Sequence, residues 1–258
     1  MPTIAVKDLT MHYLDQGTGE AVLFIHGNVS SSAWWRYTFE RMSAMPYRLI
    51  APDLRGRGAT GGSAESFTID TLADDIHALI TALNLPQVHL VGHSLGACVA
   101  IQYALNHRNF VQSLYLLAPG WVAGDMPDAV GDPERIKMLV DNKALLKAAL
   151  RMTAQKHPDE GWSALEAASM QQTDAASYRT PVALKQWNVA ARLGEIGGIP
   201  TTIARGEGDT VVPESVVMDS VNGIPNAVYS VFAGATHSPN VEIPDQFVAS
   251  LVAHLARA

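Results

Sequence analysis

Cysteine is almost absent from this chain, since Cys98 is the single one among 258 residues. One cysteine cannot form a disulfide within the chain, which is typical of a reducing compartment, so we expect a cytoplasmic location. The first residues lack the basic start and the apolar stretch of a secretory signal peptide. The paired cysteine and histidine spacings of zinc sites are also missing, and we expect neither a metal ion nor another cofactor.

Basic residues and long apolar runs are scarce as well. The chain has 18 lysines and arginines against 25 acidic residues, which gives a formal net charge of −7. Without a basic stripe to neutralise phosphates, the charge pattern excludes a nucleic-acid partner. The apolar stretches are interrupted within about ten residues, whereas a membrane-spanning helix needs about 20, so we expect no membrane span.

The composition that remains is typical of a folded globular protein, with 48% hydrophobic and 17% charged residues. The length suffices for one large α/β domain. We expect this domain to be a monomer or a homodimer and its partner to be a small-molecule substrate. Strand patterns fall at 10–15, 20–26, 47–52, 87–92, 111–118, 200–206 and 226–232. Helical patterns fall near 33–44, 68–84, 95–107, 213–221 and 244–256. This alternation predicts a mostly parallel, doubly wound sheet, whose ligands bind at the carboxyl ends of its strands.

The segment between Gly120 and Gly198 has a different pattern. Strand signals disappear there, and helical windows span Pro133 to Ala154, Asp159 to Gln172 and Thr180 to Leu193. Long helical insertions of this kind form lids that gate access to a site and exclude water. We therefore expect a core domain made of 1–119 and 198–258, with a helical cap at 120–197.

The most informative motif is a candidate nucleophile. An alternating strand pattern at 88–91 leads directly into Gly-x-Ser-x-Gly, from Gly92 to Gly96, and a helix rich in small residues follows. Strand, tight turn and helix in this order are typical of a nucleophile elbow, in which the two glycines leave room for the neighbouring backbone. The motif predicts Ser94 as the catalytic nucleophile.

A serine needs a base, and the chain offers nine histidines. Most of them fall within expected helices or strands, whereas His26, His93 and His237 lie in loops at strand ends. His93 belongs to the elbow itself, and His237 follows the strand at 228–232. We therefore predict His237 as the general base.

A carboxylate that orients this histidine is expected in the loop after the strand at 201–205. Glu207 and Asp209 both lie there. Asp209 is preferred because its shorter side chain follows a glycine at the apex of the loop, although Glu207 stays open as an alternative. The chain order serine, acid, histidine differs from that of chymotrypsin-like and subtilisin-like proteases.

A buried apolar run at 21–25 ends in His26-Gly27-Asn28, and a Pro-Asp-Leu-Arg-Gly-Arg-Gly loop follows at 52–58. With the elbow and the histidine loop, these motifs resemble the α/β-hydrolase superfamily, in the branch that has a serine nucleophile. The resemblance covers about 10–119 and about 199–255. It implies that the backbone amides of Asn28 and Leu95 form the oxyanion hole, and that the loop at 52–58 braces the oxyanion turn.

The family includes several chemistries, so the site must decide between them. Haloalkane dehalogenases and epoxide hydrolases have an aspartate where this chain has Ser94. A serine attacks acyl carbons, and an ester or lactone of a small-to-medium apolar molecule is therefore the expected substrate. The alternatives are a carbon–carbon bond hydrolase of vinylogous diketones, a cofactor-free perhydrolase or haloperoxidase, a ligand receptor with a vestigial triad, and a cofactor-free oxygenase.

Aromatic residues near the predicted site are candidates for substrate contacts. Trp121 and Trp187 lie near the two ends of the insertion, where it returns to the strand ends. Trp34 and Trp35 follow the oxyanion turn, and one of them is expected to face the pocket while the other packs in the core. We expect Trp35, Trp121 and Trp187 to bind the substrate.

Overall fold

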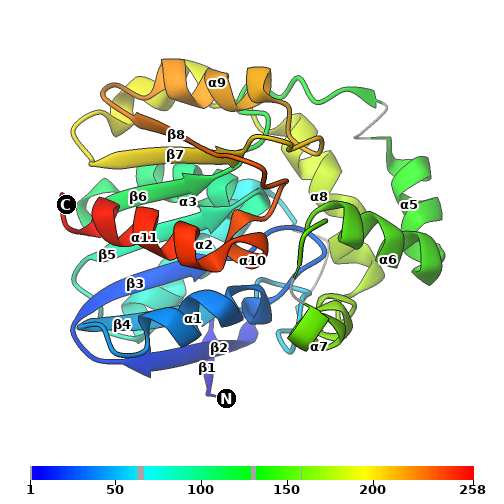
Figure 1. The fold of residues 1–258 in the computed structure, drawn as a ribbon, viewed down its shortest axis with the longest axis horizontal. Coiled ribbons are helices and arrows are strands. Elements are labelled where there is room, and N and C mark those ends of the chain that lie inside the picture. Colours follow the sequence, from blue (N-terminus) through cyan, green and yellow to red (C-terminus); the bar gives the residue numbers. More distant parts are fainter. Residues whose placement is uncertain (1, 63–66, 129–131, 158) are drawn as a thin grey trace.

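The computed structural model describes residues 2–62, 67–128, 132–157 and 159–258. An eight-stranded sheet with the order β1-β2-β4-β3-β5-β6-β7-β8 forms its centre (Figure 1). The strands are β1 (Thr3–Val6), β2 (Leu9–Gly17), β3 (Glu20–Ile25), β4 (Tyr47–Pro52), β5 (Val88–His93), β6 (Val111–Leu117), β7 (Thr201–Gly206) and β8 (Val228–Phe232).

The strand directions confirm the predicted fold class. β2 pairs antiparallel with β1 and with β4, and the pairs from β4 through β8 are parallel. Seven strands coincide with the predicted ones to within a few residues, whereas β1 is not predicted. With four residues at the edge of the sheet, β1 is too short to show a clear alternation of apolar side chains.

Helices cover both faces of the sheet. The helices around it are α1 (Arg36–Met42), α2 (Ile69–Ala82), α3 (Leu95–Asn106), α9 (Glu214–Gly223), α10 (Pro239–Glu242) and α11 (Pro244–Leu255). Figure 1 shows α1 and α11 together over one face, and these two helices pack against each other. No helix in the described parts of the chain is both long and apolar enough to cross a membrane.

Strand β3 shows why the sheet is covered on both sides. Leu23 and Ile25 belong to the apolar cluster that includes α2 and α3, whereas Val22 and Phe24 belong to the cluster that includes α1 and α11. All four side chains are fully buried. A continuous apolar run is what a parallel strand between two helical layers requires, and it explains the sequence pattern at 21–25.

The long connection between β6 and β7 is helical, as its sequence predicts. It contains α5 (Pro133–Asp141), α6 (Lys143–Met152), α7 (Asp159–Ser169), α8 (Asp174–Gln186) and the 3₁₀ segment η3 (Ala190–Ile196). Figure 1 places α5 to α8 together beside the carboxyl ends of the central strands. Residues 129–131 and 158 of the predicted cap, and 1 and 63–66 of the predicted core, lie outside the described residues.

Two details of this connection differ from the predicted windows. The window from 133 to 154 is split, because Asn142 ends α5 and its side-chain oxygen accepts hydrogen bonds from the first amides of α6. The last window begins earlier than predicted, since Thr173 caps α8 and the helix continues through Pro181 to Gln186. The same window also ends earlier than predicted, because α8 stops at Gln186 and the 3₁₀ segment η3 begins only at Ala190.

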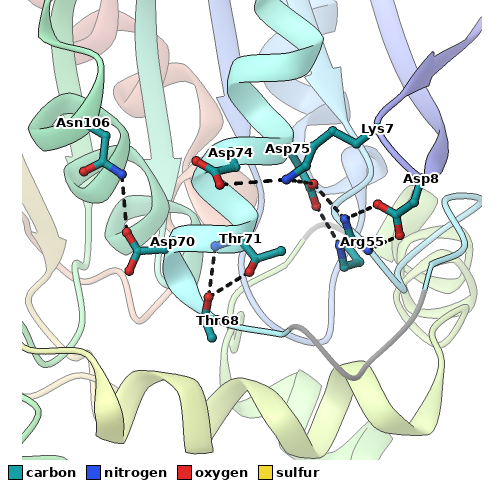
Figure 2. Close-up of polar contacts among 9 residues, drawn as sticks. All are labelled: Lys7, Asp8, Arg55, Thr68, Asp70, Thr71, Asp74, Asp75 and Asn106. Carbon is teal, nitrogen blue, oxygen red and sulfur yellow. Dashed lines mark hydrogen bonds and ion pairs between the residues drawn. The ribbon is translucent and has the colours of Figure 1, made fainter.

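A buried ion pair fixes the loop that follows β4 (Figure 2). The Arg55 guanidinium donates to both carboxylate oxygens of Asp75 on α2, each at 2.8 Å, and to those of Asp8 at 2.8 and 2.9 Å. The Asp75 side chain has no exposed surface. The hydrogen bonds from Arg55 and its charge hold the pKa of Asp8 at about 2. The loop at 53–58 is thereby tied to the β1–β2 turn and to α2.

Candidate active site

Ser94 lies at the sharp turn between β5 and α3. Its backbone has φ 54° and ψ −117°, a conformation that side-chain-bearing residues rarely adopt and that concentrates at functional sites. A Cβ atom at Gly92 would come within 2.4 Å of the Gly96 carbonyl oxygen, and one at Gly96 within 2.0 Å of the Ile25 carbonyl oxygen. Both glycines are therefore required by close backbone contacts, as the motif predicts.

His237 follows β8 and contacts a carboxylate. Its Nδ1 lies 2.8 Å from Asp209 Oδ2, and the other carboxylate oxygen accepts from the amides of Val211 and Val212 at 2.8 and 3.0 Å. Burial raises the pKa of Asp209, but the charge and hydrogen bond of His237 and the two amides lower it, so that the pKa lies below its ordinary value. A carboxylate at Nδ1 keeps the proton there, which leaves Nε2 as the acceptor.

Glu207 makes no such contact. Its side chain accepts from the Gly234 amide at 2.9 Å on the exposed side of the loop. Of the two acids that the sequence leaves open, the structure therefore brings Asp209 to His237.

Three histidines have a pKa far below the ordinary value of about 6.5: His26, His93 and His254. Burial lowers the pKa of His26 and of His254 to about 4, and that of His93 to about 3. His93 Nε2 donates to the His237 carbonyl oxygen at 2.9 Å, so that the elbow supports the histidine loop.

The predicted oxyanion turn, His26-Gly27-Asn28, packs directly against the elbow. A Cβ atom at Gly27 would lie 3.3 Å from Ser94 Cβ. His26 Nδ1 donates to the Gly27 carbonyl oxygen at 2.8 Å, and its Nε2 accepts from the Leu54 amide at 3.0 Å. Asp53 accepts from the amide of Ser32 at 2.7 Å. The loop after β4 thus braces this turn, as the resemblance implies.

Two cavities meet at Ser94. The first, of about 160 Å³, contains Ser94 and His237 and extends to Trp34. The second, of about 250 Å³, contains Ser94, Leu95 and Trp121. Both are lined by a shared set of residues: Asn28, Val29, Ser94, Leu139, Leu146 and Val211. The walls are apolar, and residues of α5 and α6 contribute to both, while α8 contributes to the second.

The predicted oxyanion residues lie at these cavities. Asn28 borders both of them, and Leu95, whose amide opens helix α3, borders the second. The first amides of a helix have no partner within the helix, so that of Leu95 is suited to hold an anion. The positions fit the prediction, and the role of the two amides stays a prediction.

The aromatic predictions are corrected in part. Trp121 lines the second cavity, as expected. The prediction for Trp35 is wrong, because this residue is fully buried in the core, with its ring centroid 5.2 Å from that of Phe24, whereas Trp34 lines the first cavity. The two are consecutive residues of one helical turn, so their side chains point in different directions, and the sequence carries no signal that separates them.

Trp187 is also wrongly predicted as a substrate contact. Its Nε1 donates to Gln102 Oε1 at 2.7 Å, and it lines a polar surface pocket between α2, α3 and the end of α8. The position of Trp187 near the end of the insertion does not indicate whether its ring lies towards Ser94 or away from it. Leu139 and Leu146 line both cavities and were not predicted, because leucines on amphipathic helices show no feature that distinguishes a cavity wall from a core.

The family to which the chain belongs follows from a comparison with known protein families. A family model described as alpha/beta hydrolase fold matches residues 20–244, and the chain belongs to this family. This membership confirms the resemblance seen in the motifs and the prediction of an enzyme of the α/β-hydrolase class.

Individual relatives differ in activity. The chain is 29% identical to the non-heme chloroperoxidase CPO-A1 of Kitasatospora aureofaciens over 92% of both chains. Among solved structures, an esterase from Exiguobacterium antarcticum has a TM-score of 0.90 at 24% identity and covers 98% of both chains. The enol-lactonase from Burkholderia xenovorans has a TM-score of 0.85 at 20% identity, covering 99% of this chain and 100% of the other.

Proposed function

We propose that this chain is a serine hydrolase that cleaves a carboxylic ester or lactone of a small-to-medium apolar molecule through an acyl-enzyme. One observation carries the proposal: Ser94, strained at the elbow, and His237, bonded to Asp209, line the same cavity. The relatives support acyl chemistry, since the similar solved structures include an esterase and an enol-lactonase.

The proposed reaction has two steps. Ser94 Oγ attacks the carbonyl carbon while its proton passes to His237 Nε2, and the amides of Asn28 and Leu95 hold the resulting oxyanion. The intermediate collapses, the bond to the leaving oxygen breaks, and Nε2 returns the proton to that oxygen. Water then attacks the acyl-enzyme by the same route, which releases the acid and restores the serine hydroxyl. Asp209 holds the imidazole in the required tautomer throughout.

We propose that each cavity holds one half of the substrate. The leaving oxygen must lie near His237, because this residue supplies its proton, so the alcohol group occupies the first cavity, beside Trp34. The acyl group then occupies the second cavity, beside Leu95 and Trp121. Both walls are apolar, and each methylene they bury contributes about 0.8 kcal/mol. We propose that the helical segment 120–197 acts as the cap that supplies these walls.

A matched set of variants tests the assignment with p-nitrophenyl esters of graded acyl length and butyrates of graded alcohol length. Trp34→Ala should change the preference among alcohols, and Trp121→Ala the preference among acyl chains, each by about tenfold. Trp187→Ala is the control, because it lies outside both cavities, and should leave both preferences unchanged. Equal losses for all substrates in all three variants would contradict the assignment.

A second activity fits the same site. Hydrogen peroxide in place of water in the second step would convert the acyl-enzyme into a peracid, and the similarity to a non-heme chloroperoxidase over most of both chains favours this test. Halide oxidation by the wild-type enzyme with acetate and hydrogen peroxide, lost in Ser94→Ala, is the expected result. Turnover of neither an ester nor a lactone, with no peracid formation, would favour the ligand receptor instead.

A further inference from the structure

Arg57 is a fully buried cation next to the oxyanion turn. Its Nη2 donates to Asn28 Oδ1 at 2.8 Å, to the Ala176 carbonyl oxygen at 3.1 Å and to Thr180 Oγ1, and its guanidinium lies over the Phe67 ring at 5.0 Å. Within the described ranges, no carboxylate pairs with it. Burial lowers its pKa to about 9.

This arrangement is unfavourable for folding alone. A buried charge that lacks an opposite charge loses its hydration without full compensation. An apolar side chain of similar volume at the same place often gives a more stable fold. Arg55, two residues earlier, shows the contrast, because it has two carboxylate partners. The contacts of Arg57 therefore point to a task at the site.

The contact with Asn28 fixes the direction of an amide. A guanidinium has only donors, so the atom of Asn28 that faces Arg57 must be Oδ1, and Nδ2 is directed elsewhere. In the part of the chain that the structure describes, Asn28 Nδ2 has no hydrogen-bond partner. It is also not one of the buried side-chain polar atoms that lack a partner, so it is accessible from the cavities. Asn28 borders both cavities together with Ser94. Nδ2 is thus a donor that is available to a molecule bound there.

We propose that Arg57 is a positioning residue that turns the Asn28 side-chain amide so that Nδ2 donates a hydrogen bond to the substrate carbonyl oxygen beside Ser94. This inference rests on the proposed hydrolase function. The donor adds to the two backbone amides, and the nearby positive charge favours the oxyanion. Through Thr180 and Ala176 the same guanidinium also holds α8, which lines the second cavity.

Asn28→Asp separates this role from a structural one. Aspartate keeps an acceptor for Arg57 and supplies the missing opposite charge, so the Tm should equal or exceed that of the wild type. It removes the Nδ2 donor and places a carboxylate beside the developing oxyanion. We expect kcat to fall by about 10² or more, with a smaller change in KM. Because the added carboxylate by itself also lowers kcat, Asn28→Ala, which removes the donor without adding a charge, must show a similar fall. An unchanged kcat in Asn28→Ala would overturn the proposal.

A double-mutant cycle tests the role of Arg57. In the wild-type background, Arg57→Met should lower kcat. In the Asn28→Ala background, the same substitution should lower kcat by less than about threefold, because Arg57 acts on the reacting carbonyl through Asn28. Arg57→Lys, which keeps the charge but loses the forked geometry, should recover only part of the activity. Equal losses from Arg57→Met in both backgrounds would overturn the positioning role.

The proposed function is checked separately in the same experiment. Wild-type ester turnover, its loss in Ser94→Ala, and the rate at which diethyl p-nitrophenyl phosphate phosphorylates Ser94 report on the nucleophile. If the wild type shows neither turnover nor phosphorylation, both the function and this inference fail. If the wild type is active and Asn28→Asp is equally active and equally fast to be phosphorylated, only this inference fails.

Discussion

Replacing Asp75 by asparagine should destabilise the protein more than the same change at its neighbour Asp74. Asp75 has no exposed side-chain surface and accepts two hydrogen bonds from Arg55, each at 2.8 Å (Figure 2). The asparagine amide presents one donor to the guanidinium and breaks at least one charge-assisted bond. Breaking a buried pair costs about 3–5 kcal/mol. Because Asp8 still pairs with Arg55, we expect the free energy of unfolding of Asp75→Asn to fall by about 3 kcal/mol, the lower end of this range.

Asp74→Asn is the matched control for this prediction. Its carboxylate is about half exposed and lies 3.9 Å from the Lys7 ammonium, so its replacement should cost less than about 0.5 kcal/mol. Urea unfolding followed by circular dichroism measures both free energies of unfolding, with an unchanged m value as the sign of comparable unfolding. Equal losses at the two positions would show that the buried pair does not stabilise the loop at 53–58.

Two further predictions concern the site and its surroundings. Asp209→Asn should lower kcat by about 10³ to 10⁴, whereas Glu207→Gln should leave ester turnover within about threefold, and the reverse order in steady-state kinetics would assign the acid to Glu207. The free energy of unfolding should fall as the pH decreases from about 6.5 towards 4. In that range the unfolded chain protonates His26, His93 and His254 and the folded chain does not, so each contributes up to about 1.4 kcal/mol per pH unit. Urea unfolding at pH 7, 6 and 5 measures this slope, and equal stability at all three would contradict it.

The parts of the fold that were predictable are those that local sequence determines. The run from Val22 to Ile25 is predictable as a strand between two helical layers, because a short continuous apolar run is typical of a strand that is covered on both faces. The elbow is predictable because backbone contacts allow only glycine at 92 and 96. Asp209 was preferred over Glu207 from loop geometry, and the structure brings Asp209 to the histidine.

The cavity walls were less predictable because they depend on tertiary packing. Trp34 and Trp35 are chemically identical neighbours, and only the orientation of one helical turn decides which of them borders the first cavity. Trp187 donates to Gln102 and does not border the cavities at Ser94, and this depends on where the chain leaves the end of α8. Arg57 lies in a motif that indicated a loop, and its sequence neighbours carry no sign that its partner is Asn28.

The most direct test of the central claim is covalent labelling of the nucleophile. The wild-type enzyme is incubated with a fluorophosphonate, and its intact mass, the modified peptide and the remaining ester turnover are measured. We predict a single adduct on Ser94, loss of turnover in proportion to labelling, no adduct in Ser94→Ala, and turnover in that variant lower by about 10⁴ to 10⁶. An unlabelled Ser94, or a Ser94→Ala variant with more than about a tenth of the wild-type rate, would contradict the account, since removal of a triad member is far more damaging than that.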